Sequence, residues 1–372
     1  MQSVSSRESG YFQGSDLPRI PDSAGPHSLK CLDSWEAQTY DSSLFFALKP
    51  PMTYPFLSAV QDDFGLVDDL IRKNLNSNVP LVEEIASYLI EAGGKRLRPL
   101  LVLLSARAAG YQGEDHIKLA AIIEFLHTAM LLHDDVVDES DLRRGRKTVN
   151  SAWGNAPSVL VGDFLHSRAF EMMVEIGNLR VMRILSRATN LISEGEVQQL
   201  ANLRNPYITE DEYFEIINRK TAMLFQAASH TGAVLAGADE KSETALRDFG
   251  HHLGIAFQLV DDQLDYQGDT IELGKNVGDD LAEGKVTLPL IVALRHGAED
   301  EKSFITETIL KGGTERLGEV IELARSTGGL RYTREAANKQ RCLALDALGS
   351  LTESPCKDAM TTLINFVVDR QS

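Results

Sequence analysis

The chain has 372 residues, enough for one large domain or two to three ordinary ones. Its 37 lysine and arginine residues against 54 aspartate and glutamate residues give a formal net charge of −17, which argues against a nucleic-acid partner. The three cysteines, Cys31, Cys342 and Cys356, form no CxxC pair, so neither a disulfide framework nor a zinc ribbon is expected. With no signal peptide and no apolar run of the roughly 18 residues that span a bilayer, we expect a cytoplasmic protein without a transmembrane segment.

Residues 1–51 differ in composition from the rest of the chain. They are rich in Ser, Gly, Pro and Asp, and they lack a sustained hydrophobic period. We therefore expect a disordered or non-native extension at residues 1–51. YFQGS resembles the tail of an engineered protease site, but the residues before it do not fit one. Scattered acidic residues argue against a transit peptide. A single domain is expected over residues 52–372.

From Phe56 onward, apolar residues recur at helical spacing, most clearly over residues 119–131 and 249–264. Alternation of the strand type is nearly absent, and glycines and prolines fall between the periodic stretches. The pattern predicts an all-α domain of ten or more helices, without the internal repeat of a solenoid.

Two of the predicted helices end in the same acidic pattern, DDxxD, within LLHDDVVD and QLVDDQLD. Positions i and i+4 share a helix face, which makes Asp134 and Asp138 neighbours, and likewise Asp261 and Asp265. Two carboxylates about 4 Å apart repel by roughly 4 kcal/mol at an effective dielectric near 20, so a cation is expected between them. Oxygen ligands with room for water and phosphate suit Mg²⁺. A single DDxxD is more often a solvated acidic face, but two copies at helix ends favour Mg²⁺ clusters around one diphosphate.

Three basic groups accompany the acidic motifs. Within GGKRLRP, RRGRK and GKNVGDDLAEGK they comprise Lys95, Arg96, Arg98, Arg143, Arg144, Arg146, Lys147, Lys275 and Lys285. Arginine binds phosphate oxygens bidentately and lysine acts as a mobile point charge. Any one group alone could be surface charge; in an acidic chain with two metal-type clusters, they indicate a substrate with several phosphates. Gly145, within RRGRK, is expected to stop a helix.

The order GGKRLRP, LLHDDVVDESDLRRG, GEVQQL, KTA, FQLVDDQLDY and GKNVGDDLAEGKVTLPL resembles the trans-polyprenyl diphosphate synthases over about residues 56–370. In detail it is most similar to the bacterial enzymes that make octaprenyl diphosphate for the ubiquinone or menaquinone side chain. The resemblance implies the isoprenoid synthase fold, a helical bundle around a central cavity, with residues 52–372 as the polyprenyl synthase domain. It also implies a homodimer, several Mg²⁺ ions per active site, and isopentenyl and allylic diphosphates as substrates, with transient membrane contact for product release.

The resemblance assigns roles to particular residues of this chain. The implied metal ligands are Asp134, Asp138, Asp261 and Asp265, with Asp135 and Asp262 in support. Isopentenyl diphosphate would lie against Lys95, Arg98, His127 and Arg144. The allylic diphosphate would contact Arg143, Lys220, Thr221, Gln258, Lys275 and Lys285. The implied catalytic set is Asp134, Asp135, Asp138, Arg143, Lys220, Asp261 and Asp262. By itself, a helix histidine such as His127 is more often an ordinary side chain than a ligand.

Product length is expected to depend on the helix before the first aspartate motif. Ala129 is the fifth residue before that motif, where short-chain relatives carry aromatic side chains, and Met130 follows it. A small residue there suggests an open tunnel and a long product of about C40, with C45–C50 or a shorter chain as alternatives. Phe164, Phe170 and Met172 are candidates for the tunnel floor. The alternative that Ala129 is present only because alanine favours helix formation stays open.

Three other classes were weighed against the synthase. A class I terpene cyclase shares the carbocation chemistry but has no use for a second full DDxxD or for the GGKRLRP group. An HD-type metal phosphohydrolase, suggested by His127 and His133, leaves the adjacent arginines unexplained. A non-catalytic subunit of a heteromeric synthase would lack motif residues, and none is missing here.

Overall fold

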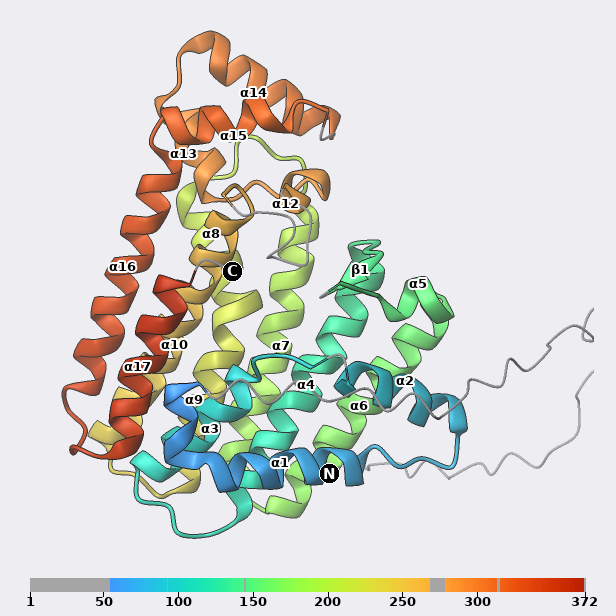
Figure 1. Ribbon diagram of the computed structural model, residues 1–372, viewed down its shortest axis with the longest axis vertical. Coiled ribbons are helices and arrows are strands. Elements are labelled where there is room, and N and C mark those ends of the chain that lie inside the picture. Colours follow the sequence, from blue (N-terminus) through green and yellow to red (C-terminus); the bar gives the residue numbers. More distant parts are fainter. Residues whose placement is uncertain (1–53, 92, 144, 268–277, 313–314, 371–372) are drawn as a thin grey trace, which may run out of the picture. The chain divides into compact units, whose positions relative to one another are not determined.

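The computed structural model describes residues 54–91, 93–143, 145–267, 278–312 and 315–370, and all of them belong to one compact unit. The expectation of an extension at residues 1–51 lies outside the described residues. The expected all-α fold is confirmed (Figure 1). Among the described residues the only strands are β1 (Leu142–Arg143) and β2 (Arg146–Lys147), which form one antiparallel hairpin.

The helices follow one another with short connections. The first half of the chain contains η1 (Pro55–Val60), α1 (Gln61–Asn74), α2 (Pro80–Glu91), α3 (Leu97–Ala108), α4 (Asp115–Val137), α5 (Val149–Trp153), α6 (Asn155–Ile176) and α7 (Leu179–Ala201). The second half contains α8 (Glu210–Ile217), η2 (Asn218–Ala222), α9 (Met223–Leu235), α10 (Glu240–Leu264), α12 (Asp279–Ala282), α13 (Leu288–His296), α14 (Glu299–Lys311), α15 (Leu317–Ser326), α16 (Gly329–Leu348) and α17 (Pro355–Asp369).

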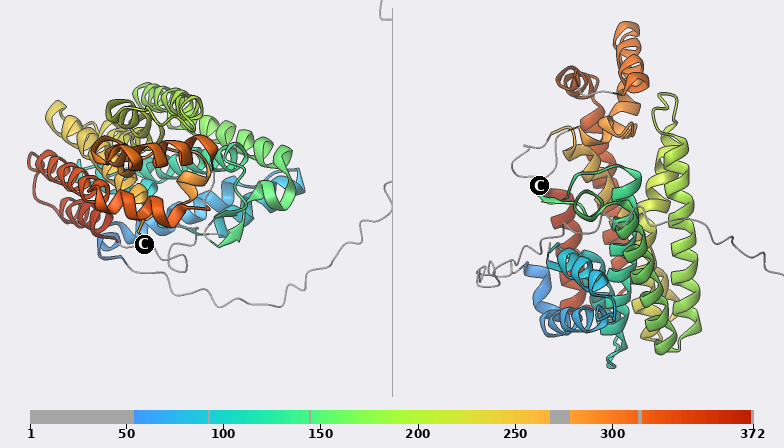
Figure 2. Two further views of the ribbon diagram at one scale, coloured as in Figure 1. Left: turned by 90° about the horizontal axis from the view of Figure 1, so that it is seen from above. Right: turned by 90° about the vertical axis from the view of Figure 1, so that its right-hand side faces the viewer.

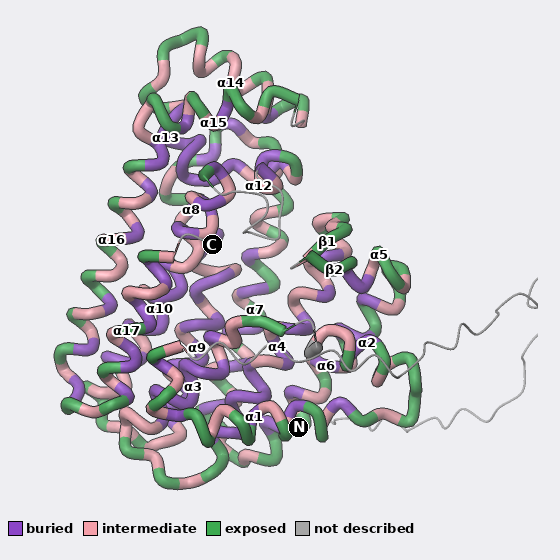
Figure 3. The backbone as a smooth tube through the Cα atoms, in the orientation of Figure 1, coloured by how far each residue is buried: buried purple, intermediate pink, exposed green. Residues whose placement is uncertain are grey.

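The core is built from helices that are apolar around most of their circumference. Helix α4 packs against α3 and α6, and α10 packs against α9 and α16. Figure 3 shows buried backbone concentrated along α3, α4, α9 and α10. Two glycines allow backbones to approach closely: an ideal Cβ on Gly232 of α9 would stand 2.8 Å from the Val102 carbonyl oxygen of α3, and one on Gly250 of α10 would stand 2.7 Å from the Phe225 carbonyl oxygen of α9. A methyl group at either position would force these helices apart.

The apolar core divides into two clusters. The larger includes side chains of α1, α3, α4, α6, α7 and α9, and the smaller includes those of α8, α13, α14, α15 and part of α16. Figure 2 shows α14 and α15 at one end of the helical bundle. None of the helices in the described ranges is long and apolar enough to cross a membrane.

Both aspartate motifs lie where a long helix ends. Helix α4 ends at Val137, and the backbone N–H of Asp138 still donates to the Asp134 carbonyl oxygen at 2.8 Å. Helix α10 ends at Leu264, and the N–H of Asp265 donates to the Asp261 carbonyl oxygen at 3.0 Å. The expected i, i+4 neighbours therefore stand on the last turns of their helices. The negative end of each helix dipole adds to the charge of these carboxylates, which increases their demand for cations.

The expectation that Gly145 stops a helix was wrong. Helix α4 has already ended at Val137, and Glu139 adopts a left-handed backbone with φ of +52°. Gly145, with φ of +74°, lies instead in the turn of the β1–β2 hairpin, where Leu142 pairs with Lys147. A tight hairpin turn requires positive φ, which glycine adopts without strain. The same residue preference serves helix ends and hairpin turns, so the sequence pattern did not distinguish them.

Candidate active site

The first carboxylate cluster combines the end of α4 with the turn that joins α8 to α9. That turn is η2, a π-helical segment that carries Lys220 and Thr221; such insertions are frequent at functional sites. Burial raises the pKa of Asp134, Lys220 opposes the rise, and the neighbouring Asp138 adds to it. Asp134 and Asp138 thus share one strongly negative environment, which Lys220 partly neutralises.

Helix α7 adds a third carboxylate, that of Glu196. Its Oε2 lies 2.6 Å from Nζ of Lys220. Burial and the nearby Asp134 raise the pKa of Glu196 to about 7 despite this ion pair. Glu196 stands in GEVQQL, a motif that sequence reasoning quoted without assigning a role. Its pairing with Lys220 becomes visible only when α7 is placed beside η2.

Asp135, on the same last turn of α4, is paired with an arginine. Its carboxylate is buried and accepts hydrogen bonds from Nε and Nη2 of Arg143 at 2.9 and 2.6 Å. The side chain of Asn150 donates to the backbone carbonyl of Asp135 at 3.0 Å. Asp135 is therefore placed to hold the guanidinium of Arg143 beside the end of α4.

Lys285 connects the first cluster to the segment that follows the second motif. Its Nζ lies 2.9 Å from Oδ2 of Asp138 and also forms an ion pair with Glu283. Burial disfavours the charge of Lys285, but Asp138, Glu283 and Asp280 together raise its pKa above the ordinary value. Because 147 residues separate Lys285 from Asp138, only the tertiary fold brings them together.

The second motif, like the first, is partly buried. Asp265 accepts a hydrogen bond from the backbone N–H of Asp280 at 3.3 Å, and burial together with Asp280 raises its pKa to about 8. Asp262 is 1% exposed, and burial and Asp280 raise its pKa to about 8 as well. Burial and the neighbouring carboxylates disfavour the charged form of both groups, and a cation near Asp265 would stabilise that form.

A hydrogen-bonded chain fixes the position of Asp262. The hydroxyl of Tyr213 donates to its Oδ2, and Nε2 of Gln258 donates to its Oδ1 at 2.7 Å. The hydroxyl of Thr221 donates to Oε1 of Gln258 at 2.7 Å. The predicted residues Thr221, Gln258 and Asp262 therefore form one network, and Tyr213 of α8 is a member that the sequence did not reveal.

Asp261, the remaining carboxylate of the second motif, is paired with Arg370, the residue that follows α17. Nη2 of Arg370 lies 2.5 Å from its Oδ1. The side chain of Arg370 is 8% exposed, whereas that of Asp261 is 41% exposed. Arg370 had no predicted role.

Among the residues expected to bind isopentenyl diphosphate, Lys95 lies just before α3, Arg98 on α3 and His127 on α4. Nη1 of Arg98 lies 3.2 Å from Nε2 of His127, and the guanidinium of Arg98 stands 4.3 Å from the centre of the Phe225 ring. Nζ of Lys95 stands 5.5 Å from the centre of the Phe366 ring of α17. A pocket next to them is lined by His127, Asp135, Arg143, Arg96, Arg146 and Lys147. Its lining is rich in cations and suits an anionic ligand.

Not every predicted residue can be placed. Lys275 and Arg144 lie outside the described residues. Among the candidates for chain length, Ala129 is buried on α4, while Phe164 and Phe170 are partly buried on α6, which packs against α4. The ring of Phe164 stands 5.2 Å from the guanidinium of Arg168. Met130 is half-buried, and Met172 is buried.

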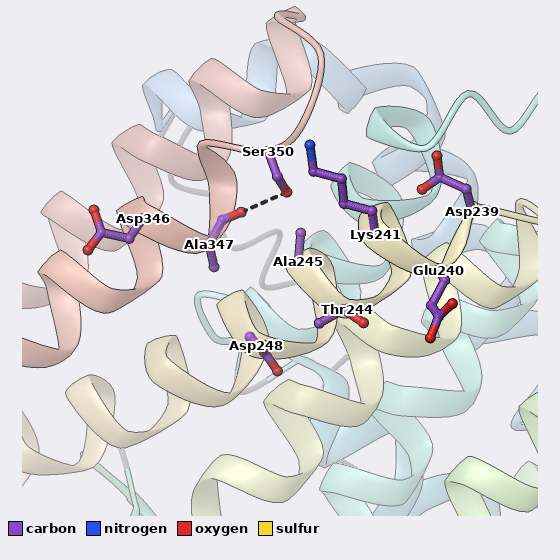
Figure 4. A pocket seen from close by; sticks show the side chains of 9 residues that line it. All are labelled: Asp239, Glu240, Lys241, Thr244, Ala245, Asp248, Asp346, Ala347 and Ser350. Carbon is purple, nitrogen blue, oxygen red and sulfur yellow. Dashed lines mark hydrogen bonds between the residues drawn. The ribbon is translucent and has the colours of Figure 1, made fainter.

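A second groove lies far from these carboxylates. Figure 4 shows it between the start of α10 and the end of α16, with Asp239, Lys241, Asp248 and Asp346 around it. The carboxylate of Asp239 caps α10 by accepting from the N–H of Ser242 at 2.7 Å. The helical rise places this groove roughly 30 Å along α10 from the second aspartate motif. Its charged residues therefore belong to the helix terminus and not to the site described above.

The described carboxylates fit a divalent ion by their chemistry. As they are arranged, no three His, Cys, Asp or Glu side chains within the described residues are placed to hold a metal ion. Cationic side chains accompany the carboxylates instead: Lys285 forms an ion pair with Asp138, and Arg370 forms one with Asp261. The cluster supplies oxygen donors only, and burial, with neighbouring carboxylates, raises the pKa values of Asp134, Asp262 and Asp265. A cation nearby would stabilise their charged forms. Hard oxygen-binding ions such as Mg²⁺ suit this set.

Comparison with known proteins agrees with this geometry. A family model described as polyprenyl synthetase matches residues 79–325. The chain is 48% identical over 309 residues to the octaprenyl diphosphate synthase of Escherichia coli (strain K12), covering 83% of this chain and 96% of that enzyme. It is 46% identical over 315 residues to the all-trans-nonaprenyl-diphosphate synthase (geranyl-diphosphate specific) of Rhodobacter capsulatus, covering 84% of this chain and 97% of that enzyme. The crystal structure of a polyprenyl synthase from Caulobacter crescentus CB15, complexed with calcium and isoprenyl diphosphate, matches with a TM-score of 0.83 and 44% identity, over 86% of this chain and 98% of that chain.

The fold and the two carboxylate-tipped helices define a prenyltransferase with the all-α isoprenoid synthase fold. The chain belongs to the polyprenyl synthetase family. The expected family, fold class and enzyme class are thereby confirmed, and the HD-type phosphohydrolase is excluded.

Proposed function

We propose that this chain is a long-chain trans-polyprenyl diphosphate synthase. It adds isopentenyl diphosphate repeatedly to an allylic diphosphate, farnesyl diphosphate, and yields about C40 octaprenyl diphosphate for a quinone side chain. The observation that carries the proposal is the meeting of the two aspartate motifs: Lys285 pairs with Asp138 of the first and lies near Asp280, whose N–H binds Asp265 of the second. The similarity to the octaprenyl enzyme of Escherichia coli supports this product class.

Several Mg²⁺ ions would be held by Asp134, Asp138, Asp261 and Asp265. When bound, Mg²⁺ stabilises the negative charge that develops on a diphosphate leaving group. The exposed fraction of Asp261, 41%, leaves its carboxylate accessible to such an ion. Asp135 and Asp262 are occupied by protein donors, and their part is to position Arg143 and Gln258.

The side chains around the allylic diphosphate neutralise charge and exclude water. Lys220, Lys285 and Arg143 supply positive charge next to the first motif, and charge stabilisation of this kind is usually the largest catalytic contribution. Breaking the allylic C–O bond leaves a delocalised cation, which the double bond of isopentenyl diphosphate attacks. A proton is then lost, and we assign its uptake to the departing diphosphate. Lys285, whose side chain is 15% exposed, would help to keep water from the cation.

Isopentenyl diphosphate is assigned to the basic side chains beside the first motif. Lys95, Arg98, His127 and Arg144 are the proposed contacts, and the placement of Arg98 against His127 at 3.2 Å supports this reading. Because two diphosphates would bind in one site, two sets of basic side chains are needed, one for each diphosphate. A terpene cyclase, which binds one diphosphate, needs only half of them.

Product analysis tests the proposal directly. The purified chain is incubated with farnesyl diphosphate, labelled isopentenyl diphosphate and Mg²⁺, and the product lengths are measured. Repeated elongation to about C40 supports the proposal. Consumption of farnesyl diphosphate alone would indicate a cyclase, and elongation only with a second subunit would indicate a component of a heteromeric enzyme. A product of C45–C50 would keep the class and correct the length, as the nonaprenyl relative allows.

The working unit is proposed to be a homodimer formed through α6 and α7. Apolar side chains are exposed on both helices, with Leu160 at 65% and Val174 at 64% on α6 and Val197 at 66% on α7. Replacing both α6 residues by aspartate should give a monomer in sedimentation velocity. Leu310→Asp on α14, where the native side chain is 55% exposed, is the control and should leave the dimer intact. A double variant that stays dimeric would contradict this assignment.

The long apolar tail of the product is unfavourable in water, so it must pass into an apolar environment after synthesis. A transient contact with a membrane is therefore part of the proposal. A cytoplasmic location is also proposed, because the spacing of the three cysteines indicates no disulfide framework. Co-sedimentation of the enzyme with lipid vesicles during turnover, but not without substrates, would support that contact.

A further inference from the structure

Arg370 is a buried cation at the end of α17 that is directed at the second aspartate motif. Its Nη2 lies 2.5 Å from Oδ1 of Asp261 and 3.0 Å from the backbone carbonyl oxygen of Phe257. Its guanidinium stands 4.2 Å from the centre of the Phe257 ring. Residues 257 and 261 are one turn apart on α10, so a single turn of that helix receives the whole guanidinium.

The position of Arg370 is fixed by more than its contact with Asp261. Nη1 of Arg334 on α16 donates to the carbonyl oxygen of Val368 at 2.6 Å. Arg334 and Arg341 also pair with the carboxylate of Asp369, at 3.4 and 3.2 Å. These contacts anchor the end of α17 on α16 and deliver the next residue, Arg370, to α10. The pairing with Asp261 is therefore built into the packing of three helices.

One possible hydrogen bond of the Arg370 side chain is not formed in this arrangement. Its Nε is buried and has no hydrogen-bond partner among the described residues. A buried donor without an acceptor is unfavourable, so the guanidinium is not held in a fully satisfied site. Its remaining contacts are with the Phe257 carbonyl and ring and with the carboxylate of Asp261, which is a proposed metal ligand.

We propose that Arg370 is the internal counter-cation of Asp261 and that it sets the affinity of the second aspartate motif for divalent ions. This inference rests on the proposed function, since it takes Asp261 as a metal ligand. The guanidinium neutralises the carboxylate when the metal is absent, and it repels a divalent ion that approaches the same oxygen. An ion that binds Asp261 would therefore have to share Oδ1 with Arg370 or displace the guanidinium from it. When Arg370 pairs with Oδ1 again, it would favour release of the ion together with the product diphosphate.

The test uses the full-length chain and Mn²⁺ as the probe, with bound ions counted by electron paramagnetic resonance. Arg370→Gln removes the charge and keeps a polar side chain that can donate hydrogen bonds. It should lower the melting temperature without metal and tighten Mn²⁺ binding by about tenfold, because a nearby positive charge is lost. Arg370→Lys, which keeps the charge, should return the affinity toward that of the unaltered chain. Arg341→Gln is the matched control: it removes one positive charge from the same helix junction but not from Asp261, and should leave the affinity unchanged.

The outcomes separate the possible failures. If Arg370→Gln lowers the melting temperature but leaves the Mn²⁺ affinity unchanged or weaker, Arg370 is only structural and the inference is wrong. If the unaltered chain binds no Mn²⁺, or Asp261→Asn binds it equally well, the proposed metal site fails and the inference fails with it. Should Arg370→Gln not fold, Arg370→Met removes the same cation and keeps an unbranched side chain that can pack on Phe257, and its Mn²⁺ affinity decides the question.

Discussion

Replacing Ala129 by tyrosine tests how the product length is controlled. Ala129 is 3% exposed and stands on α4, five residues before Asp134, which corresponds to about 7.5 Å along the helix axis. If its side chain borders the path of the growing chain, the phenol ring blocks that path and the product should shorten to about C15–C20.

The same substitution has a different result if Ala129 is merely packed in the core. Inserting a large side chain into a well-packed interior destabilises by about 1–3 kcal/mol. For a unit of roughly 320 residues the entropy of unfolding is about 0.7 kcal/mol/K, so the melting temperature would fall by about 1–4 °C. Shorter products with a small loss of stability indicate a tunnel, whereas a lower melting temperature with unchanged products indicates a core position.

The assay combines product analysis with calorimetry. Farnesyl diphosphate and labelled isopentenyl diphosphate are supplied with Mg²⁺, and the lengths of the dephosphorylated products are compared. Ala129→Ser, which keeps the side chain small, is the control and should retain the long product. A folded Ala129→Tyr enzyme that still makes the long product would refute the account of length control.

Two further substitutions test the charges inside the fold. Lys285→Gln keeps a polar side chain but leaves Asp138 without its cation, so kcat at saturating Mg²⁺ should fall by roughly 10²–10³-fold. A loss of less than tenfold would contradict the role assigned to Lys285. Asp63→Asn weakens the pairs with Arg107 and with the fully buried His116, and it should lower the free energy of unfolding by about 1–3 kcal/mol near pH 7. The hydrogen bond from Arg107 lowers the pKa of Asp63, so this stabilisation is present above the ordinary value of 3.8 and is lost as the pH falls through the lowered value. Melting curves should therefore differ between the two chains near neutral pH and converge in strong acid; a difference that persists there would show another origin.

The local features of this protein followed from its sequence. The i, i+4 spacing within each DDxxD placed Asp134 beside Asp138 and Asp261 beside Asp265, because helical geometry repeats every few residues whatever surrounds it. The apolar periodicity likewise predicted an all-α domain, since an amphipathic or fully apolar helix is defined by residues close in the chain. Gly145 is the exception: glycine permits positive φ in a hairpin turn as readily as after a helix, and the pattern does not say which.

What the tertiary structure decided is which charges neutralise which. The partners of the motif residues are distant in the sequence: Lys285 of Asp138, Arg370 of Asp261, Tyr213 of Asp262. Ion pairs between remote segments depend on how whole helices pack, and packing is determined by the sum of many weak apolar contacts that no short motif records. The sequence by itself determined the helices and the carboxylates at their ends, and the fold alone determined the cations that meet them.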